Sequence, residues 1–346
     1  CTSRGKDAKT AAADLLWDIR KAFENVERDT LWEKGTNNGY PLDILRLSLA
    51  SYEWERMLSM GLLVSRPIKP SRGIAAGSAF ATFELTLYLL DLMRMHKKEC
   101  PGVTLSVHVD DFSQSAIAPT EEEVVDKLKH STETVLKALK TLNMPLAEDK
   151  GQIVATTPKL ARQILTSIGP DAGSITDQAK RLGVDYAISK QGKKKGKVAR
   201  HRMANARARI KILRKLRKHG EGPKIFFAGI KPAAMYGIEL YEASPKAIKE
   251  LDAGAALAIA VRPPGVPHFM TLMSVQTASL PGYLAAAAPI MRIAREIWTT
   301  VGTQEHNKSH GDALTPRELV DLWWEIQKAP DNITSMEQGP IRALQA

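Results

Sequence analysis

Apolar and polar positions along the first half of the chain predict strands interleaved with helices. Residues 13–23 are mainly apolar, which indicates a buried strand. Residues 103–109 place valine or leucine at every second position, as a half-buried strand does. Residues 75–96 are apolar over a length that suits a buried helix. Apolar residues recur at helical spacing over 120–142, so a second long helix is expected there.

Capping and turn residues refine this pattern. Thr120 and Glu123 form a capping box, which places the start of the second long helix at Thr120. Beyond residue 190 the spacing is almost entirely helical, and residues 224–298 are rich in alanine. Shorter elements are predicted as a helix over 41–54 and strands over 62–66, 152–156 and 180–189.

Composition places the chain among ordinary globular proteins. It has 346 residues, of which 44% are hydrophobic and 25% are charged, and this length suits two or three sub-domains. Its apolar runs are shorter than the roughly 18 residues of a membrane span, so no membrane association is expected. Two cysteines and no signal peptide favour a nuclear or cytoplasmic protein that is not secreted. Cys1 stands where a methionine is usual, so we expect a piece of a longer polypeptide.

The positive charge is concentrated in one segment. The whole chain has a net charge of +11, but residues 190–224 contain 15 lysines and arginines and one acid, Glu221. This segment therefore carries +14, and the remainder carries −3. A local excess of this size predicts a surface that binds a polyanion such as nucleic acid. A solvated helix face or a nuclear-import signal is the alternative.

Within this segment the spacing predicts an amphipathic helix. Met203, Ala206, Ile210 and Leu213 fall on one stripe, which would pack against the protein. The cations around the stripe are candidates for contact with nucleic-acid phosphates: Arg202, Arg207, Arg209, Lys211, Arg214, Lys215 and Lys218.

Three aspartates are the strongest candidates for chemistry. Asp18, Asp110 and Asp111 all stand at or near the ends of apolar strands, where an acid is unfavourable unless it has a role. Two adjacent strands would bring them together, and clustered carboxylates need a cation. Mg²⁺ or Mn²⁺ suits oxygen ligands, and two such ions can activate a 3′-hydroxyl and stabilise a leaving pyrophosphate. The alternative is that the Asp-Asp pair merely forms a turn.

Five short motifs occur in the order found in reverse transcriptases. The run Asp18–Phe23 resembles motif A, and Val107–Asp111 resembles motif C. Residues 72–79 resemble motif B, and Leu142-Asn143 together with Lys150 resembles motif D. Residues 181–184 resemble motif E, which is called the primer grip. Together they resemble the enzymes of non-LTR (LINE-type) retrotransposons over residues 15–186, and more loosely as far as residues 235–239.

This resemblance implies an RNA-directed DNA polymerase that uses two Mg²⁺ or Mn²⁺ ions, dNTPs, an RNA template and a DNA primer. Asp18 and Asp110 would be the shared metal ligands, with Asp111 a weaker one. Lys150 would act as general acid or charge stabiliser beside the pyrophosphate. Phe23 corresponds to the family's steric gate against ribonucleotides. Phe23 could instead be a core side chain, and Lys150 a surface lysine.

The resemblance also implies the remaining site residues and the fold. Arg72 and Gly77 would line the nucleotide and template side, although a glycine at a helix start is common. Leu182 and Gly183 would form the primer grip. The implied fold class is α+β, with a small antiparallel sheet under packed helices, followed by a helical part. The expected domains are a palm over 1–188, a basic helical thumb over 189–242, and a helical region of unknown role over 243–346.

The chain departs from the family pattern at several positions. Ala76 stands where motif B usually has glutamine, and His108 where motif C usually has tyrosine or phenylalanine. The proline usually found further along motif B is absent, and only 17 residues precede Asp18. The family's fingers region would therefore be largely missing, and we expect the chain alone to polymerise poorly.

Three other functions stay open. A catalytically silent, decayed or domesticated relative would only bind nucleic acid, which the changes at Ala76 and His108 favour. A viral RNA-dependent RNA polymerase shares the palm, but Phe23 argues against it. A purely structural helical protein would fit residues 224–346 and would leave the three aspartates unexplained.

Overall fold

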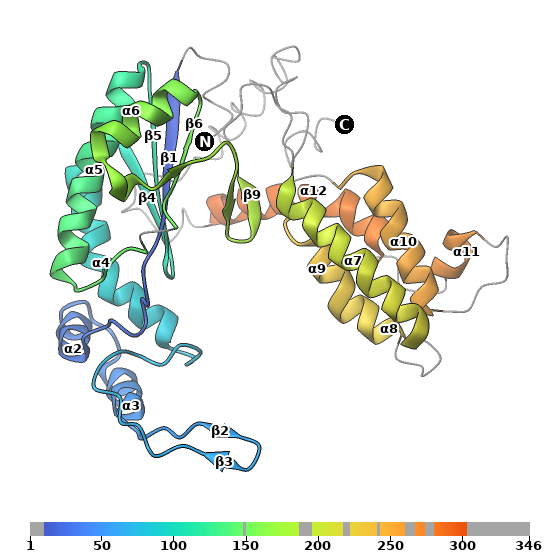
Figure 1. Cartoon of the computed structure of the whole chain (residues 1–346), viewed down its shortest axis with the longest axis horizontal. Helices are drawn as coiled ribbons and strands as arrows, with labels where there is room; N and C mark the ends of the chain where they lie inside the picture. The colour runs from blue at the N-terminus through green and yellow to red at the C-terminus, as the bar shows by residue number, and fades with distance from the viewer. Residues whose placement is uncertain are drawn as a thin grey trace. The chain divides into compact units, whose positions relative to one another are not determined.

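The chain folds into two compact units (Figure 1). The computed structural model describes residues 10–147, 150–186, 196–216, 222–240, 243–259, 267–273 and 280–302. One unit comprises residues 1–179 and 187–190, and the other comprises residues 180–186 and 191–346. Within the described residues, no helix is both long enough and apolar enough to span a membrane.

The first unit is built on a five-stranded sheet with the strand order β4-β5-β1-β6-β7. Neighbouring strands are antiparallel except β6 and β7, which are parallel. The sheet is therefore small and mostly antiparallel, and the fold class is α+β as expected. The strands are β1 (Ala11–Asp18), β4 (Val103–His108), β5 (Asp111–Ala118), β6 (Gln152–Ala155) and β7 (Ser174–Ile175).

Helices α4 (Ala81–Glu99), α5 (Glu121–Thr141) and α6 (Pro158–Ile168) lie on one face of this sheet (Figure 1). The apolar core lies between the two layers, and it includes Trp17 of β1 and Phe112 of β5. These two residues face each other across the β1–β5 pair, and both are at most 4% exposed. Burial of such side chains is the main source of stability of the unit.

The structure places several element ends differently from the sequence pattern. The strand expected over 13–23 ends at Asp18, and Lys21, with a φ of 52°, lies in the following turn. The helix expected from residue 75 begins at Ala81, because Gly77 has a φ of 91° and interrupts it. The start predicted for α5 is confirmed, since the Thr120 hydroxyl accepts a hydrogen bond from the Glu123 N–H at 3.3 Å.

Between the end of β1 and α4 lie two helices and a hairpin. The helix α3 (Leu42–Tyr52) was expected, whereas α2 (Arg28–Asn37) and β2 (Ser59–Met60) were not. Strand β2 pairs with β3 (Leu63–Val64) to form an arm that projects beyond α3 (Figure 1). Its apolar side chains are exposed: Met57, Leu58, Met60, Leu62, Leu63 and Val64. The strand predicted over 62–66 is present in part, as β3.

The second unit contains a short hairpin and a set of helices. The strand predicted over 180–189 is a hairpin of β8 (Ala179–Arg181) and β9 (Val184–Tyr186), and residues 187–189 lie outside the described residues. The predicted basic helix is α7 (Lys197–Leu216). The other helices are α8 (Gly222–Ile225), a π-helix (Phe226–Ile230), α9 (Lys231–Met235), α10 (Pro245–Ile259), α11 (His268–Leu272) and α12 (Pro281–Gly302).

The start of α7 is held by an acid of the hairpin. Both carboxylate oxygens of Asp185 accept hydrogen bonds at 3.0 Å, from the backbone N–H groups of Val198 and Ala199. A carboxylate at this position satisfies free backbone donors and interacts favourably with the helix dipole. Since Asp185 is 4% exposed, the hairpin and α7 form one packed structure.

A buried histidine predicts a dependence of stability on pH. The Nε2 atom of His96 lies 2.7 Å from the Ser131 hydroxyl, and burial, with a smaller effect of His130, lowers the pKa of His96. In the unfolded chain this pKa is about 6.5. Below about pH 6.5 the unfolded chain therefore binds a proton that the folded chain does not, and the free energy of unfolding decreases.

We expect the wild type to lose more stability between pH 7.5 and pH 5.5 than the variant His96→Gln, as measured by urea unfolding. The variant His130→Gln is the control. It removes the smaller of the two causes that lower the pKa of His96, so it should retain most of the pH dependence of stability. Equal losses in the wild type and His96→Gln would contradict this assignment.

Candidate metal centre and nucleic-acid-binding surfaces

The pairing of β1 with β5 brings the three predicted aspartates together. Asp18, the last residue of β1, is the partner of Asp111, the first residue of β5. Asp110 immediately precedes β5, and its carbonyl accepts a hydrogen bond from the Ile19 N–H at 2.9 Å. One carboxylate oxygen from each aspartate lies within 4.8 Å of the others. The three carboxylates could therefore hold a metal ion, as oxygen ligands for Mg²⁺ or Mn²⁺ do.

Asp110 stands in a tight turn. His108 and Asp111 are paired, so the turn between β4 and β5 has two central residues, Val109 and Asp110. Val109 has a φ of 60°, whereas Asp110 has a negative φ. A positive φ at the first central residue alone is typical of a type II′ turn, which normally has glycine there. A β-branched residue in this conformation is strained, and such strain is common next to functional groups.

The environment of Asp18 fits a cation. Its side chain is 14% exposed, and its Oδ1 atom is buried without a hydrogen-bond partner. Its Oδ2 atom accepts a hydrogen bond from the Lys150 ammonium group. A buried carboxylate oxygen without a partner is unfavourable, and a bound cation would satisfy it. The four residues predicted to be catalytic, Asp18, Asp110, Asp111 and Lys150, thus lie in one place.

The predicted nucleotide-binding residues lie in the connection between β1 and α4. Phe23 is partly buried against the core of the first unit, and its carbonyl accepts a hydrogen bond from the Ile74 N–H at 2.9 Å. Arg72 is exposed, and its guanidinium lies 4.0 Å from the Glu27 carboxylate. Gly77 has open space where a Cβ would be.

Gly73, and not the predicted site residue Gly77, makes the close backbone approach in this connection. It has a φ of 84°, and a Cβ there would lie 2.8 Å from the Glu24 carbonyl oxygen. Its carbonyl accepts a hydrogen bond at 2.9 Å from the Arg28 guanidinium, which also donates to the Tyr52 carbonyl at 2.9 Å. Nothing in a single sequence distinguishes Gly73 from Gly77, because the difference lies in segments that are distant along the chain.

The predicted nucleic-acid contacts in α7 differ in their availability. Arg207 is engaged with Glu250 at 2.7 Å, and Arg202 donates to the carbonyls of Tyr236, at 2.8 Å, and Gly183. Three further candidates in α7, Arg209, Lys211 and Lys215, are also exposed. Of the other candidates, Arg214 lies in α7, but the structure does not describe its side chain. Lys218 lies outside the described residues.

The two predicted primer-grip residues form the turn between β8 and β9. Leu182 has a φ of 46° and Gly183 a φ of 77°. Two successive positive φ values are typical of a type I′ turn, in which a residue such as leucine is unfavourable. The Leu182 side chain is 41% exposed, so it is available for contact with a ligand.

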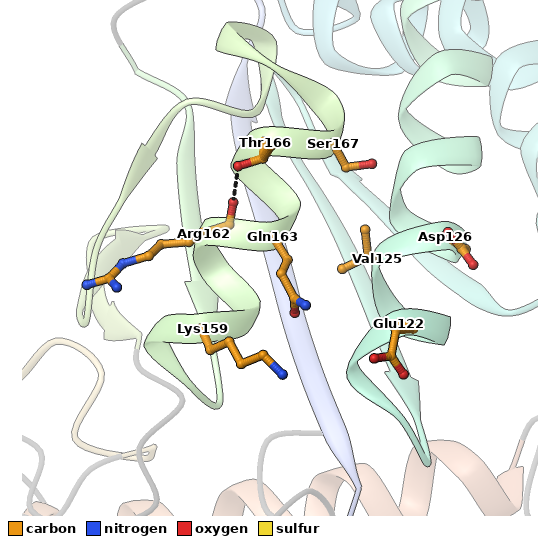
Figure 2. Close-up of a pocket in the computed structure, with 8 residues that line it drawn as sticks. All are labelled: Glu122, Val125, Asp126, Lys159, Arg162, Gln163, Thr166 and Ser167. Carbon is orange, nitrogen blue, oxygen red and sulfur yellow. Dashed lines mark hydrogen bonds between the residues drawn. The ribbon is translucent and has the colours of Figure 1, made fainter.

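A cavity of about 520 Å³ lies between α5 and α6, away from all of the predicted site residues (Figure 2). Glu122 of α5 and Lys159 of α6 extend toward the space between the helices, whereas the lining residues Asp126 and Arg162 point away from it. Gln163 extends into the space between the helices, and its Oε1 atom is buried without a hydrogen-bond partner. No group of catalytic type is assembled here, so the carboxylate cluster remains the candidate site.

Comparison with known proteins gives only distant structural similarity. No protein-family model matches the chain, and no curated protein matches it. A solved apo telomerase from Candida tropicalis, truncated of its C-terminal domain, is 11% identical, with a TM-score of 0.38 over 54% of this chain and 36% of that chain. A telomerase from Candida albicans, in complex with the TWJ fragment of telomeric RNA, is also 11% identical, with a TM-score of 0.35 over 94% of this chain and 49% of that chain. This chain thus spans half or less of the length of both proteins, and similarity at this level does not establish a family.

Substitution of the two glycines should separate steric contact from backbone strain. We expect Gly73→Ala to lower the free energy of unfolding by about 1–3 kcal/mol, since it combines a positive φ with a clash against Glu24. Gly77→Ala should lower it less, because its φ is positive but its surroundings are open. Denaturant unfolding of both variants measures the difference, and an equal effect would show that the close approach is unimportant.

The carboxylate cluster should bind a divalent cation in solution. We expect Mn²⁺ binding, measured by electron paramagnetic resonance, to weaken about tenfold or more in Asp110→Asn, because a charged ligand is removed. Asp43→Asn is the matched control, since Asp43 is exposed and lies in the first turn of α3. Unchanged Mn²⁺ binding in Asp110→Asn would exclude a metal centre at the cluster.

Proposed function

We propose that the chain is the palm and thumb portion of an RNA-directed DNA polymerase of the retroelement type. The observation that carries this proposal is the cluster of three carboxylates at paired strand ends, with Lys150 bound to Asp18. The palm would comprise residues 1–188, the basic thumb 189–242, and residues 243–346 would form a helical region without an assigned role. The order of the motifs along the chain supports this assignment.

The chemistry would be nucleotidyl transfer from a dNTP to a primer 3′-hydroxyl. Asp18 and Asp110 would hold two Mg²⁺ or Mn²⁺ ions, with Asp111 as a weaker ligand. Bound ions of this kind activate the attacking hydroxyl and neutralise charge on the leaving pyrophosphate. Lys150 neutralises part of the carboxylate charge when it is paired with Asp18, and on release it could donate a proton to the pyrophosphate.

The remaining residues would select and hold the substrates. Phe23 would exclude the 2′-hydroxyl of a ribonucleotide, and Arg72 and Gly77 would line the nucleotide and template side. The turn of Leu182 and Gly183 would hold the primer end. The exposed cations of α7 would contact phosphates of the RNA template and DNA primer, contacts that depend on salt and not on base sequence.

A second candidate function is binding of nucleic acid without catalysis. Ala76 and His108 favour it, because each replaces a residue type that the polymerase pattern places beside the nucleotide or the Asp pair. His108 is exposed and pairs directly with Asp111, so this change lies beside the carboxylate cluster. The intact carboxylates favour the polymerase.

Primer extension separates the two functions. We expect the purified chain to extend oligo(dT) on poly(rA) with dTTP and Mn²⁺ slowly and over short lengths. Asp110→Asn should reduce the rate at least a hundredfold, because a metal ligand is lost, while its affinity for the RNA–DNA hybrid stays within about threefold of wild type. Asp43→Asn should extend as the wild type does.

Each outcome of this assay is informative. Equal extension by Asp110→Asn and the wild type would overturn the assignment of the catalytic site. Absence of extension by the wild type, with binding of the hybrid retained, would favour the silent binding protein. Absence of both extension and binding would overturn both functions.

A further inference from the structure

The second unit has a pocket on α7 that adjoins the turn between β8 and β9. It has a volume of about 270 Å³ and is lined by residues of α7, the π-helix and α9, with Tyr236 at the end of α9. Its apolar lining consists of Ala206, Ile230, Ala233 and Ala234. This volume is smaller than the usual site for a drug-sized ligand, so the pocket suits a fragment such as one nucleobase.

One wall of the pocket is a fixed aromatic ring. The Arg202 guanidinium lies 4.6 Å from the centre of the Tyr236 ring and donates to the Tyr236 and Gly183 carbonyls. The Tyr236 hydroxyl in turn donates to the Leu182 carbonyl at 3.1 Å. These bonds tie Tyr236 to the turn of β8 and β9, so the ring is held in place. Arg202 therefore acts within the protein and is not free to bind phosphate with both amino groups.

The ring nevertheless keeps an accessible surface. Tyr236 is 56% exposed although Arg202 covers one side of it. An exposed aromatic ring held in a fixed position is a platform on which a base can stack, with little loss of side-chain entropy. The apolar side chains that line the pocket beside the ring would contact the part of the base that Tyr236 does not cover.

The other rim of the pocket offers hydrogen-bond donors. Asn205 and Arg209 line the pocket, and both are exposed. Arg209 forms no ion pair with any residue in the described part of the chain. A guanidinium group and an amide together can bind phosphate oxygens and the polar edge of a base. The pocket thus combines a stacking surface, an apolar lining and a free positive charge.

We propose that this pocket holds one unpaired nucleotide of a single strand, with its base against Tyr236 and its phosphate bound by Arg209 and Asn205. The proposal rests on the proposed nucleic-acid-binding function and adds a preference for single-stranded over duplex nucleic acid. Since Tyr236 is bonded to Leu182, the nucleotide would lie next to the predicted primer-grip turn. A base in a duplex is stacked on its neighbours and could not enter the pocket.

Two variants of the 346-residue chain test the pocket, one by removing a charge and one by filling the cavity. Arg209→Ala removes the free charge, and Lys211→Ala is its control, because it removes an exposed charge from the same helix outside the pocket. Ala233→Trp fills the pocket without a change of charge, and Ala233 is exposed, so the fold should tolerate the larger side chain. Fluorescence anisotropy measures the binding of a labelled single-stranded oligo(rU) and of a duplex of the same length.

We expect Arg209→Ala and Ala233→Trp each to weaken single-strand binding about tenfold. Ala233→Trp should change duplex binding at most twofold, whereas Arg209→Ala should weaken duplex binding as much as Lys211→Ala does, because both variants remove an exposed charge from α7. Lys211→Ala should affect both nucleic acids equally. If both pocket variants bind the single strand as tightly as Lys211→Ala does, the proposal that the pocket holds a nucleotide is overturned, while the proposed function stands. If the wild type binds neither nucleic acid, the proposed function fails as well.

Discussion

The candidate site depends on the register between β1 and β5. Trp17 faces Phe112 in the core, and the next pair along the two strands is Asp18 and Asp111. A shift of the register by one residue would expose the aromatic side chains and bury charge, so apolar burial fixes the position of the carboxylates. The same burial opposes the mutual repulsion of the three aspartates, which the sheet brings within 4.8 Å of one another.

This arrangement leaves one carboxylate oxygen of the cluster without a hydrogen-bond partner. Asp18 has one buried oxygen without a partner, and Lys150 compensates only the other. The tight turn that places Asp110 also requires Val109 to adopt a φ of 60°. Both features lower stability. An ion bound between the carboxylates would compensate the unpartnered oxygen of Asp18. The apolar packing of the rest of the sheet offsets this local loss of stability.

Local patterns predicted the elements that carry this site and missed the contacts that shape its surroundings. The alternation over residues 103–109 predicted β4, and Thr120 predicted the start of α5, because both signals lie within a few residues of the chain. The end of β1 at Asp18 was missed, since Ile19, Ala22 and Phe23 continue the apolar pattern beyond it. The role of Gly73 depends on the Glu24 backbone, which lies far along the chain, and no local pattern contains that information.

The basic helix shows why a count of charges is a poor measure of a binding surface. Arg202 and Arg207 belong to the same charged run as Arg209, but their guanidinium groups are bonded to carbonyls and to Glu250. Their charge still contributes to the long-range potential, which attracts a polyanion. Specific contacts, however, require donors that are not already engaged. Some cations of α7 therefore stabilise the second unit, and others remain available to bind a ligand.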